Sequence, residues 1–255
     1  MIHYQLLNCG FFHADGGAMF GAIPKAAWSH RVITDEQNRC RMGMNCVLAW
    51  TDDRVILIDT GVGTKSLEEL IYYDFRDTKD IRDLVIEAGF KPEEVTDVIL
   101  THLHFDHCGG CSYLDKDGEL MVSFPNARHY VGKKQWENYM NPNQLEAKSF
   151  RQKDMKPVHS SGLLQLVEED LELFPGFRIE LYDGHTYDQL AVIFDTEDRH
   201  LVVPGDVIPT RYHQSDIWIS AYDIEPLQSL RSKQALKKKY PRDQYTYIFF
   251  HDIIQ

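Results

Sequence analysis

The chain has 255 residues, of which 43% are hydrophobic and 12% aromatic, so it can bury a sizeable core. With 39 acidic against 27 basic residues its net charge is −12, and such a surface repels phosphate backbones, which argues against nucleic acid as a partner. The five cysteines are odd in number and are not spaced as in a small disulfide scaffold. We therefore expect a soluble protein with reduced thiols, located in the cytoplasm.

Nothing in the sequence predicts contact with a membrane. The first residues, Met-Ile-His-Tyr, do not begin a secretory signal, and no apolar run is long enough to cross a bilayer. No repeat, low-complexity tract or linker divides the chain. We therefore predict one domain that spans residues 1–255.

The N-terminal part combines a strand with a long apolar loop. Residues 3–9 predict a strand, and residues 11–28 follow with no helical or strand period. Long loops of this kind often serve a binding site, and we predict that this one lines the mouth of a substrate pocket. A loop that simply packs on its own domain is the alternative. The predicted pocket residues are Phe11, Met19, Phe20, Ile23 and Trp28.

The next segment predicts a buried hairpin and two helices. Residues 46–50 and 55–58 are apolar runs that flank a polar turn, and Asp59 follows the second run. Asp59 either forms the turn that precedes Gly61 or has a role in a functional site. Residues 66–73 and 80–88 predict helices, with Asp80 as an N-cap of the second. A buried strand is expected at residues 97–101.

The sequence Thr-His-Leu-His-Phe-Asp-His-Cys-Gly-Gly at residues 101–110 is the most informative stretch of the chain. His102 and His104 alternate on an extended chain and can point to one side, whereas Asp106 and His107 follow in a turn and can serve a second position. Like ionisable groups crowded in this way cost free energy unless a cation binds them, and imidazole and carboxylate groups are the usual ligands of zinc. The motif therefore predicts two adjacent metal sites, and a histidine-rich surface loop is the alternative.

Several further elements are expected after the motif. Strands are predicted at residues 120–124, 127–131, 177–181, 191–194, 200–203 and 246–250, and helices at 134–140, 145–152 and 226–239. Three residues with metal-ligating side chains follow the ends of three of these strands, namely His185, Asp206 and His251. Two runs of strands with helices between them predict two packed sheets covered by helices.

The motif resembles the signature of the metallo-β-lactamase-fold hydrolases, in particular the dinuclear members such as the N-acyl homoserine lactonases. The Asp-Gly-Gly-Ala-Met-Phe-Gly stretch at residues 15–21 resembles the YtnP-like quorum-quenching lactonases, a narrower group. The resemblance implies an α/β fold, a four-layer αβ/βα sandwich with mixed sheets. It also implies that His102, His104 and His185 hold one metal, that Asp106, His107 and His251 hold the other, and that Asp206 bridges them. Asp59 would support a metal-binding histidine.

The chain departs from these relatives at two positions. Related lactonases have a second histidine where this chain has Gln189, which puts the supporting role of that position in doubt. Some also have a tyrosine three residues after the bridging aspartate, where it polarises the substrate carbonyl, and this chain has Pro209 there. We predict that Tyr212 or His213 takes this role, with packing of the ring in the loop as the alternative.

These features predict a dinuclear metal-dependent hydrolase. We expect two divalent metal ions, with zinc as the expected metal, and attack by a hydroxide that bridges them. Asp106 would orient this nucleophile or pass a proton to the leaving group. The leading hypothesis is a lactonase that opens N-acyl homoserine lactones. Alternatives are an esterase or organophosphate hydrolase on the same site, or a non-catalytic metal-dependent binding protein. We expect a small-molecule lactone or ester as partner and leave a homodimer open.

Overall fold

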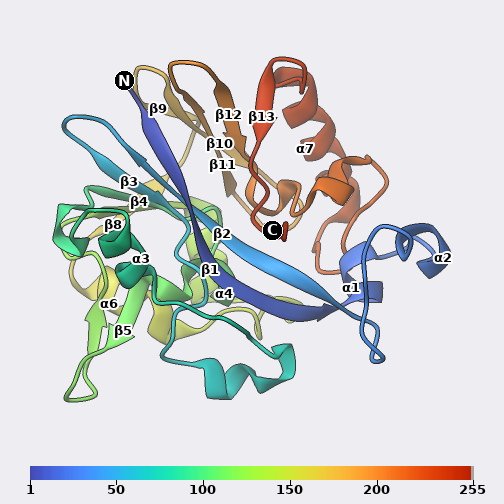
Figure 1. Cartoon of the computed structure of the whole chain (residues 1–255), viewed down its shortest axis with the longest axis horizontal. Helices are drawn as coiled ribbons and strands as arrows, with labels where there is room; N and C mark the ends of the chain where they lie inside the picture. Colours follow the sequence, from blue (N-terminus) through green and yellow to red (C-terminus); the bar gives the residue numbers. More distant parts are fainter. Residues whose placement is uncertain (254–255) are drawn as a thin grey trace.

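The structure is a computed structural model that describes residues 1–253. Two sheets pack face to face, with helices on their outer sides (Figure 1). The first sheet has the order β1 (His3–Asp15), β2 (Arg39–Trp50), β3 (Val55–Ile58), β4 (Asp97–Ile99), β7 (Arg128–Gly132) and β8 (Leu164–Val167). The second has the order β13 (Tyr245–Tyr247), β12 (His200–Val203), β11 (Gln189–Asp195), β10 (Phe177–Tyr182) and β9 (Leu171–Phe174).

Both sheets are mixed. In the first, β1, β2 and β3 are antiparallel neighbours, and β3, β4, β7 and β8 are parallel. In the second, β9 to β12 are antiparallel and β13 runs parallel to β12. A separate hairpin joins β5 (Ser112–Leu114) to β6 (Leu120–Val122). The predicted αβ/βα sandwich with mixed sheets is confirmed.

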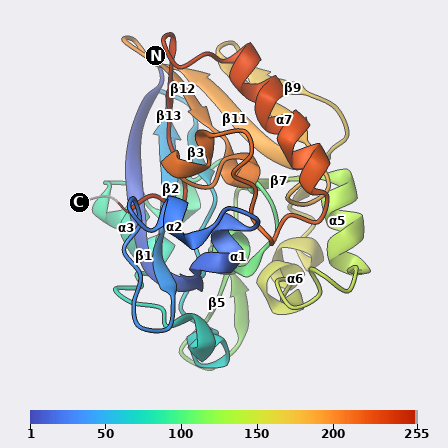
Figure 2. The ribbon, with the colours of Figure 1, turned by 90° about the vertical axis from the view of Figure 1, so that its right-hand side faces the viewer.

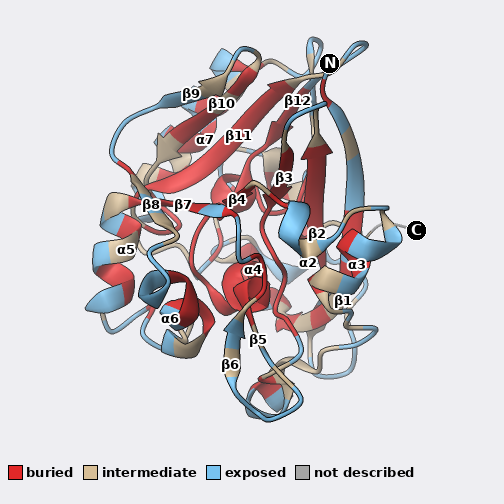
Figure 3. Ribbon diagram, turned by 90° about the vertical axis from the view of Figure 1, so that its left-hand side faces the viewer, coloured by how far each residue is buried: buried red, intermediate tan, exposed pale blue. Residues whose placement is uncertain are grey.

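Strand β11 shows how one segment serves two cores. Leu190, Val192 and Phe194 face the first sheet and belong to the core between the sheets. Ala191 and Ile193 face the other way and pack against α7 (Pro226–Lys239), as the two-residue period of a strand requires. Figure 2 shows α7 running along the outer face of the second sheet. Figure 3 shows the inner strands β2 and β11 coloured largely as buried, as expected for the inner layers of a four-layer fold, whereas the edge strands β1 and β9 carry exposed and intermediate residues.

Helices also cover the outer face of the first sheet. These are α3 (Ile81–Glu87), α5 (Lys133–Met140) and α6 (Gln152–Ser160). The short helices are α1 (Gly16–Phe20) and α2 (Lys25–Trp28), which lie beyond the ends of β1 and β2 in Figure 1, and α4 (Phe105–Cys108). The 3₁₀ helices are η1 (Leu67–Tyr73), η2 (Pro92–Glu94), η3 (Gly109–Cys111), η4 (Gly205–Val207) and η5 (Arg211–Gln214). Within residues 1–253, none of these helices has the length and apolar character to cross a membrane.

Two of the predicted helices agree with the structure for the expected reasons. Asp80 accepts a hydrogen bond from the backbone N–H of Arg82 at 2.9 Å and so caps α3, whose apolar face carries Ile81, Leu84 and Val85. Helix α7 has the predicted bounds, with Pro226 in its first turn and three lysines at its C-terminal end.

The prediction of an irregular loop at residues 11–28 was wrong. Strand β1 continues to Asp15, which then caps α1 by accepting a hydrogen bond from the backbone N–H of Ala18 at 2.9 Å. The register with β2 shifts between Asn8 and Phe11, and this irregularity hid the period of the strand in the sequence. Helix α2 follows at Lys25–Trp28.

Two other predicted elements were wrong. No helix forms at residues 145–152; the chain turns there, because Asn143 Oδ1 accepts the backbone N–H groups of Leu145 and Glu146, and helix α6 begins only at Gln152. The strand predicted at 246–250 ends at Tyr247, as β13. Beyond it the chain crosses to β2, where Asn45 donates its backbone N–H to Phe250.

Candidate metal centre

The seven predicted ligands come from four places in the fold. His102 and His104 follow β4, and Asp106 and His107 lie in α4, the next turn of the chain. His185 lies in the turn between β10 and β11, Asp206 in η4 after β12, and His251 beyond β13. The list of predicted ligands is His102, His104, Asp106, His107, His185, Asp206 and His251, and all seven are buried.

These side chains form three overlapping groups whose ligand atoms lie within 4.8 Å of one another. The first group is His102, His104 and His185, and the second is Asp106, His107 and His251. A third group joins His102 and His107 to Asp206. Asp206 also lies 3.5 Å from His185 Nε2 and 3.3 Å from His251 Nε2, so its carboxylate faces both of the first two groups.

Each of the five histidines has one nitrogen held from outside the cluster. His102 Nδ1 lies 3.2 Å from Thr101 Oγ1, His104 Nε2 lies 3.2 Å from Glu146, and His107 Nδ1 lies 2.9 Å from Asp59. His185 Nδ1 lies 2.9 Å from Asp223 Oδ1, and His251 Nδ1 lies 2.9 Å from the carbonyl oxygen of Gly43. An outer acceptor fixes the ring so that its other nitrogen is unprotonated and available to a metal.

The nitrogen and oxygen atoms that face the interior of the cluster are arranged as metal ligands rather than as hydrogen-bond partners of one another. His104 Nδ1 lies 3.0 Å from His102 Nε2 and 3.2 Å from His185 Nε2, which places three imidazole nitrogens around one point. His107 Nε2 and Asp206 Oδ1 are buried and have no hydrogen-bond partner among the described residues. Unpaired buried polar atoms are costly, so this donor set fits divalent cations.

The electrostatics of the cluster point the same way. Burial, together with the neighbouring imidazoles, holds the pKa of His102 well below its usual range. Burial alone would raise the pKa of Asp206, but the charges of His251 and His107 outweigh it and hold that pKa well below the usual range. Asp206 is therefore an ionised carboxylate placed among the histidines.

The two supporting positions discussed for the sequence have clear contacts. Asp59 accepts hydrogen bonds from the backbone N–H and the hydroxyl of Thr101, and it also faces His107. The same carboxylate therefore stabilises the turn and supports a histidine of the cluster. Gln189 Oε1 accepts the backbone N–H of Asp206 at 3.1 Å. The departure from histidine at this position therefore retains a side chain that positions the central aspartate.

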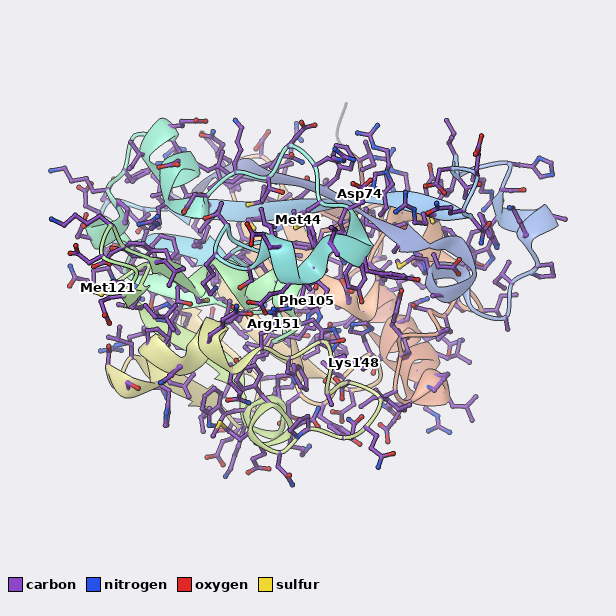
Figure 4. The ribbon with its side chains drawn as sticks, turned by 90° about the horizontal axis from the view of Figure 1, so that it is seen from below. Met44, Asp74, Phe105, Met121, Lys148 and Arg151 are labelled. Carbon is purple, nitrogen blue, oxygen red and sulfur yellow. The ribbon has the colours of Figure 1, made fainter. Side chains whose placement is uncertain are left out.

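A cavity of about 160 Å³ opens over the cluster. His104, Asp106, His185, Asp206 and His251 form its floor. The walls come from separate segments and are largely apolar or aromatic, namely Phe12, Met19, Tyr73, Phe105, Leu145, Pro209 and Tyr222. Figure 4 labels Phe105, which lies beside η1; its ring centroid is 5.1 Å from that of Tyr73.

Of the predicted pocket residues, only Met19 lines this cavity. Phe20 and Trp28 stack on each other with centroids 4.9 Å apart inside the core. Ile23 packs beside that core, and Phe11 lies on the other side of β1, where Arg41 stacks over its ring. Successive side chains of a strand point to opposite faces, so Phe12 of β1 faces inward and Phe11 does not.

The prediction that Tyr212 or His213 contacts the substrate is not supported by their positions. His213 is buried, its Nδ1 lies 2.7 Å from Thr210 Oγ1, and its Nε2 lies 2.8 Å from the carbonyl oxygen of Met19. Both of its nitrogens are therefore used within the fold. Tyr212 lies beside a different cavity, so neither side chain lines the one over the cluster.

Four important residues were missed from the sequence. Glu146 and Asp223 hold His104 and His185, and Tyr73 and Tyr222 line the cavity. No local pattern marks them, since each lies in an irregular segment or at the end of a short helix. Only the tertiary structure brings them to the cluster.

Comparison with known proteins agrees with this fold. The family model of the metallo-beta-lactamase superfamily matches residues 42–251. An N-acyl homoserine lactonase of Bacillus cereus is 26% identical over 224 residues, which is 82% of this chain and 81% of the relative. A solved structure described as a probable metal-dependent hydrolase from Staphylococcus aureus is 30% identical, with a TM-score of 0.90 over 98% of this chain and 89% of that one.

A more distant solved structure, an N-acyl homoserine lactone hydrolase with its product N-hexanoyl-L-homoserine at the catalytic metal centre, is 21% identical with a TM-score of 0.77. It covers 98% of this chain and 93% of that one and supports the fold. The chain belongs to the metallo-beta-lactamase superfamily. Within it, the chain is a metal-dependent hydrolase, and its relatives include N-acyl homoserine lactonases.

Proposed function

We propose that the protein is a lactonase that opens N-acyl homoserine lactones with two divalent metal ions, zinc being the expected metal. The observation that carries this proposal is the combination of seven converging ligands with a cavity whose walls are aromatic and apolar. The lactonase relatives support the choice of substrate class. An ester or a phosphotriester is the second candidate, because it is also neutral and apolar.

The charges around the cavity favour a neutral substrate. Within residues 1–253, no lysine or arginine lines the cavity. Each ionisable group in its wall, apart from the two tyrosines, belongs to the cluster or holds one of its histidines. A substrate with a carboxylate or phosphate would find no cationic side chain there to pair with. A cyclic ester with an acyl chain has neither group.

The chain's own residues provide the proton transfer and the orientation. Two bound divalent ions would supply a water of lowered pKa and stabilise the developing oxyanion. Asp106 lies 3.6 Å from His251 Nε2 and 3.7 Å from His107 Nε2 and lines the cavity, so its carboxylate can take a proton and pass it to the leaving alkoxide.

Tyr222 is the phenol best fixed at the cavity. Its neighbour Asp223 holds His185, the backbone N–H of Ile224 binds the carbonyl of His185, and the N–H of Ala221 binds that of Ala18. The segment is thus pinned on both sides of Tyr222. We propose that its hydroxyl donates a hydrogen bond to the substrate carbonyl in place of Tyr212.

Tyr222→Phe tests this role. Loss of one donor to the oxyanion should lower kcat about 100-fold, by the usual magnitude for such donors, with both metals still bound. Tyr182→Phe is the control, because the Tyr182 hydroxyl donates a hydrogen bond to Glu180 and Tyr182 does not line the cavity. Steady-state kinetics with metal analysis on both variants would separate the outcomes. An unchanged kcat in Tyr222→Phe would remove the residue from the mechanism.

A panel of acyl homoserine lactones of increasing chain length tests the substrate class. Each methylene buried against the apolar wall contributes about 0.8 kcal/mol, which is roughly a fourfold gain per methylene. kcat/KM of the metal-loaded protein should rise with chain length until the wall is covered. Metal analysis of the same protein should approach two equivalents per chain.

Leu145→Ser tests the wall itself. Leu145 lines the cavity but is 79% exposed, so its loss should not affect folding. We expect the dependence on chain length to flatten, whereas Leu227→Ser, at a leucine 71% exposed on α7, should leave it unchanged. Equal rates on short and long acyl lactones would refute the role of the apolar wall in binding the acyl chain. Activity confined to aryl esters or phosphotriesters would refute the lactonase proposal and favour the second candidate.

A further inference from the structure

A second cavity, of about 590 Å³, lies on the other side of His251 from the metal cluster. It is bounded by the segment at residues 31–33, the start of β2, η5, and the residues Asp252 and Ile253. Its volume falls in the range of small-molecule sites, about 300–1,000 Å³. The lactonase proposal assigns no role to this cavity.

Three arginines line the second cavity, Arg31, Arg41 and Arg211. Among the described residues its only carboxylate is that of Asp252, which lies 2.8 Å from Arg211 Nε. The cavity therefore has an excess of positive charge, although the chain as a whole has a net charge of −12. The catalytic cavity has no lysine or arginine in its described lining, so the two cavities differ in the charge of ligand that they favour.

Within residues 1–253, the guanidinium groups of Arg31 and Arg41 donate no hydrogen bond, and each lies over an aromatic ring. Arg31 lies over the ring of Trp218 at 5.1 Å, and Arg41 lies over the ring of Phe11 at 3.9 Å. Stacking uses the face of the guanidinium group and leaves the N–H groups at its edge free. Arg211 uses Nε for Asp252, which leaves its two terminal nitrogens. Planar donors arranged in this way match the oxygens of a carboxylate, phosphate or sulfonate.

Most of the remaining lining is apolar or aromatic, although Thr210 and His251 also contribute to it. The apolar and aromatic residues are Phe20, Val32, Ile33, Met42, Tyr212 and Ile253. Ile33 is 91% exposed, so a large apolar side chain stands in solvent beside the arginines. A ligand with an anionic head and a short apolar chain would pair with the arginines and cover this surface.

We propose that this cavity binds an amphiphilic organic anion, a molecule with a carboxylate-like head and an apolar chain, at a site distinct from the metal centre. The bound head would lie against the segment of His251 and Asp252, which Asn45 also holds through the carbonyl of Asp252 at 2.6 Å. This proposal does not depend on the lactonase activity, because it concerns binding at the three arginines and Ile33, none of which lines the catalytic cavity, although His251 lies beside both cavities.

Octane-1-sulfonate is the probe, because sulfonate pairs with guanidinium groups but is a poor ligand for metal ions. Calorimetry on the metal-loaded protein should detect one equivalent per chain, with affinity that falls as salt rises. Octan-1-ol has the apolar chain without the anionic head, and inorganic sulfate has the anionic group without the chain. Each should bind at least tenfold more weakly than octane-1-sulfonate. Binding of sulfate alone as tightly as octane-1-sulfonate would refute the role of the apolar wall.

Variants at exposed residues locate the binding. Arg31→Gln combined with Arg41→Gln should weaken octane-1-sulfonate at least tenfold. Arg39→Gln, two residues from Arg41 but paired with Asp35, should not. Ile33→Ser should weaken binding, whereas Ile71→Ser, at an isoleucine 83% exposed outside the cavity, should not. Affinity unchanged in the double arginine variant, with thermal unfolding also unchanged, would place the anion elsewhere and refute the proposal.

Discussion

Asp59→Asn tests the support of the metal cluster most directly. Asp59 is buried and accepts three donors, namely the backbone N–H of Thr101 at 2.7 Å, the Thr101 hydroxyl at 2.8 Å and His107 Nδ1 at 2.9 Å. Its φ of 58° lies in the left-handed region, which asparagine also tolerates. The substitution should therefore preserve the turn and change only the chemistry of one oxygen.

The amide of asparagine would present an N–H group where Asp59 presents an acceptor. His107 Nδ1 could then no longer donate, and the ring would place its proton on Nε2, the nitrogen that faces the cluster. A hydrogen bond to a charged acceptor is worth about 1.5–3 kcal/mol, and about 1.4 kcal/mol corresponds to a factor of ten. We therefore expect the metal held by Asp106, His107 and His251 to bind about 10- to 100-fold more weakly, as is usual for such supporting groups.

Competition with a chelator of known affinity, followed by metal analysis, measures this effect for each metal. Asp97→Asn is the matched control, since Asp97 is equally buried in β4 but pairs with Arg54 and Tyr130. It should lower stability and leave metal affinity unchanged. Retention of both metals at parental affinity in Asp59→Asn would show that this carboxylate does not set the tautomer of His107.

Two further predictions concern other buried side chains. Glu146→Gln replaces the carboxylate beside His104 Nε2 with an uncharged amide of similar size. A metal ion bound by His102, His104 and His185 should then bind about tenfold more weakly in the same chelator assay. Burial lowers the pKa of His129 to about 4, below its value of about 6.5 when unfolded, so the unfolded chain takes up the proton first. The resulting stability is present above pH 6.5 and is lost as the pH falls towards 4, by up to about 3 kcal/mol. Urea unfolding of the parent and of His129→Gln should show the difference between them shrinking by about that amount over this range, and a constant difference would contradict the assignment.

The metal cluster could be predicted from the sequence because its pattern is local. Four of the seven residues lie within six positions, and the others each follow a stretch with a clear strand pattern. The prediction of the ligands did not depend on exact strand boundaries. His251 lies beyond β13 rather than at its end, yet it reaches the cluster because the chain crosses from β12 to β2.

The substrate cavity could not be predicted in this way. Its walls come from β1, α1, η1, α4 and three irregular segments, which only the packing of the two sheets brings together. The shift of register in β1 also concealed which of Phe11 and Phe12 faces inward. Apolar side chains near a functional motif are as often core as pocket, and Phe20 and Trp28 are examples of the former.

The irregular segments connect the two parts of the site. Glu146, which holds His104, is next to Leu145 in the cavity wall, and Asp223, which holds His185, is next to Tyr222 in the same wall. In each pair the carboxylate fixes the backbone that presents the wall residue. Because the two histidines belong to one metal group, occupancy of that group would stabilise both wall segments at once. Metal binding and the shape of the substrate cavity are therefore expected to be coupled through these two short segments.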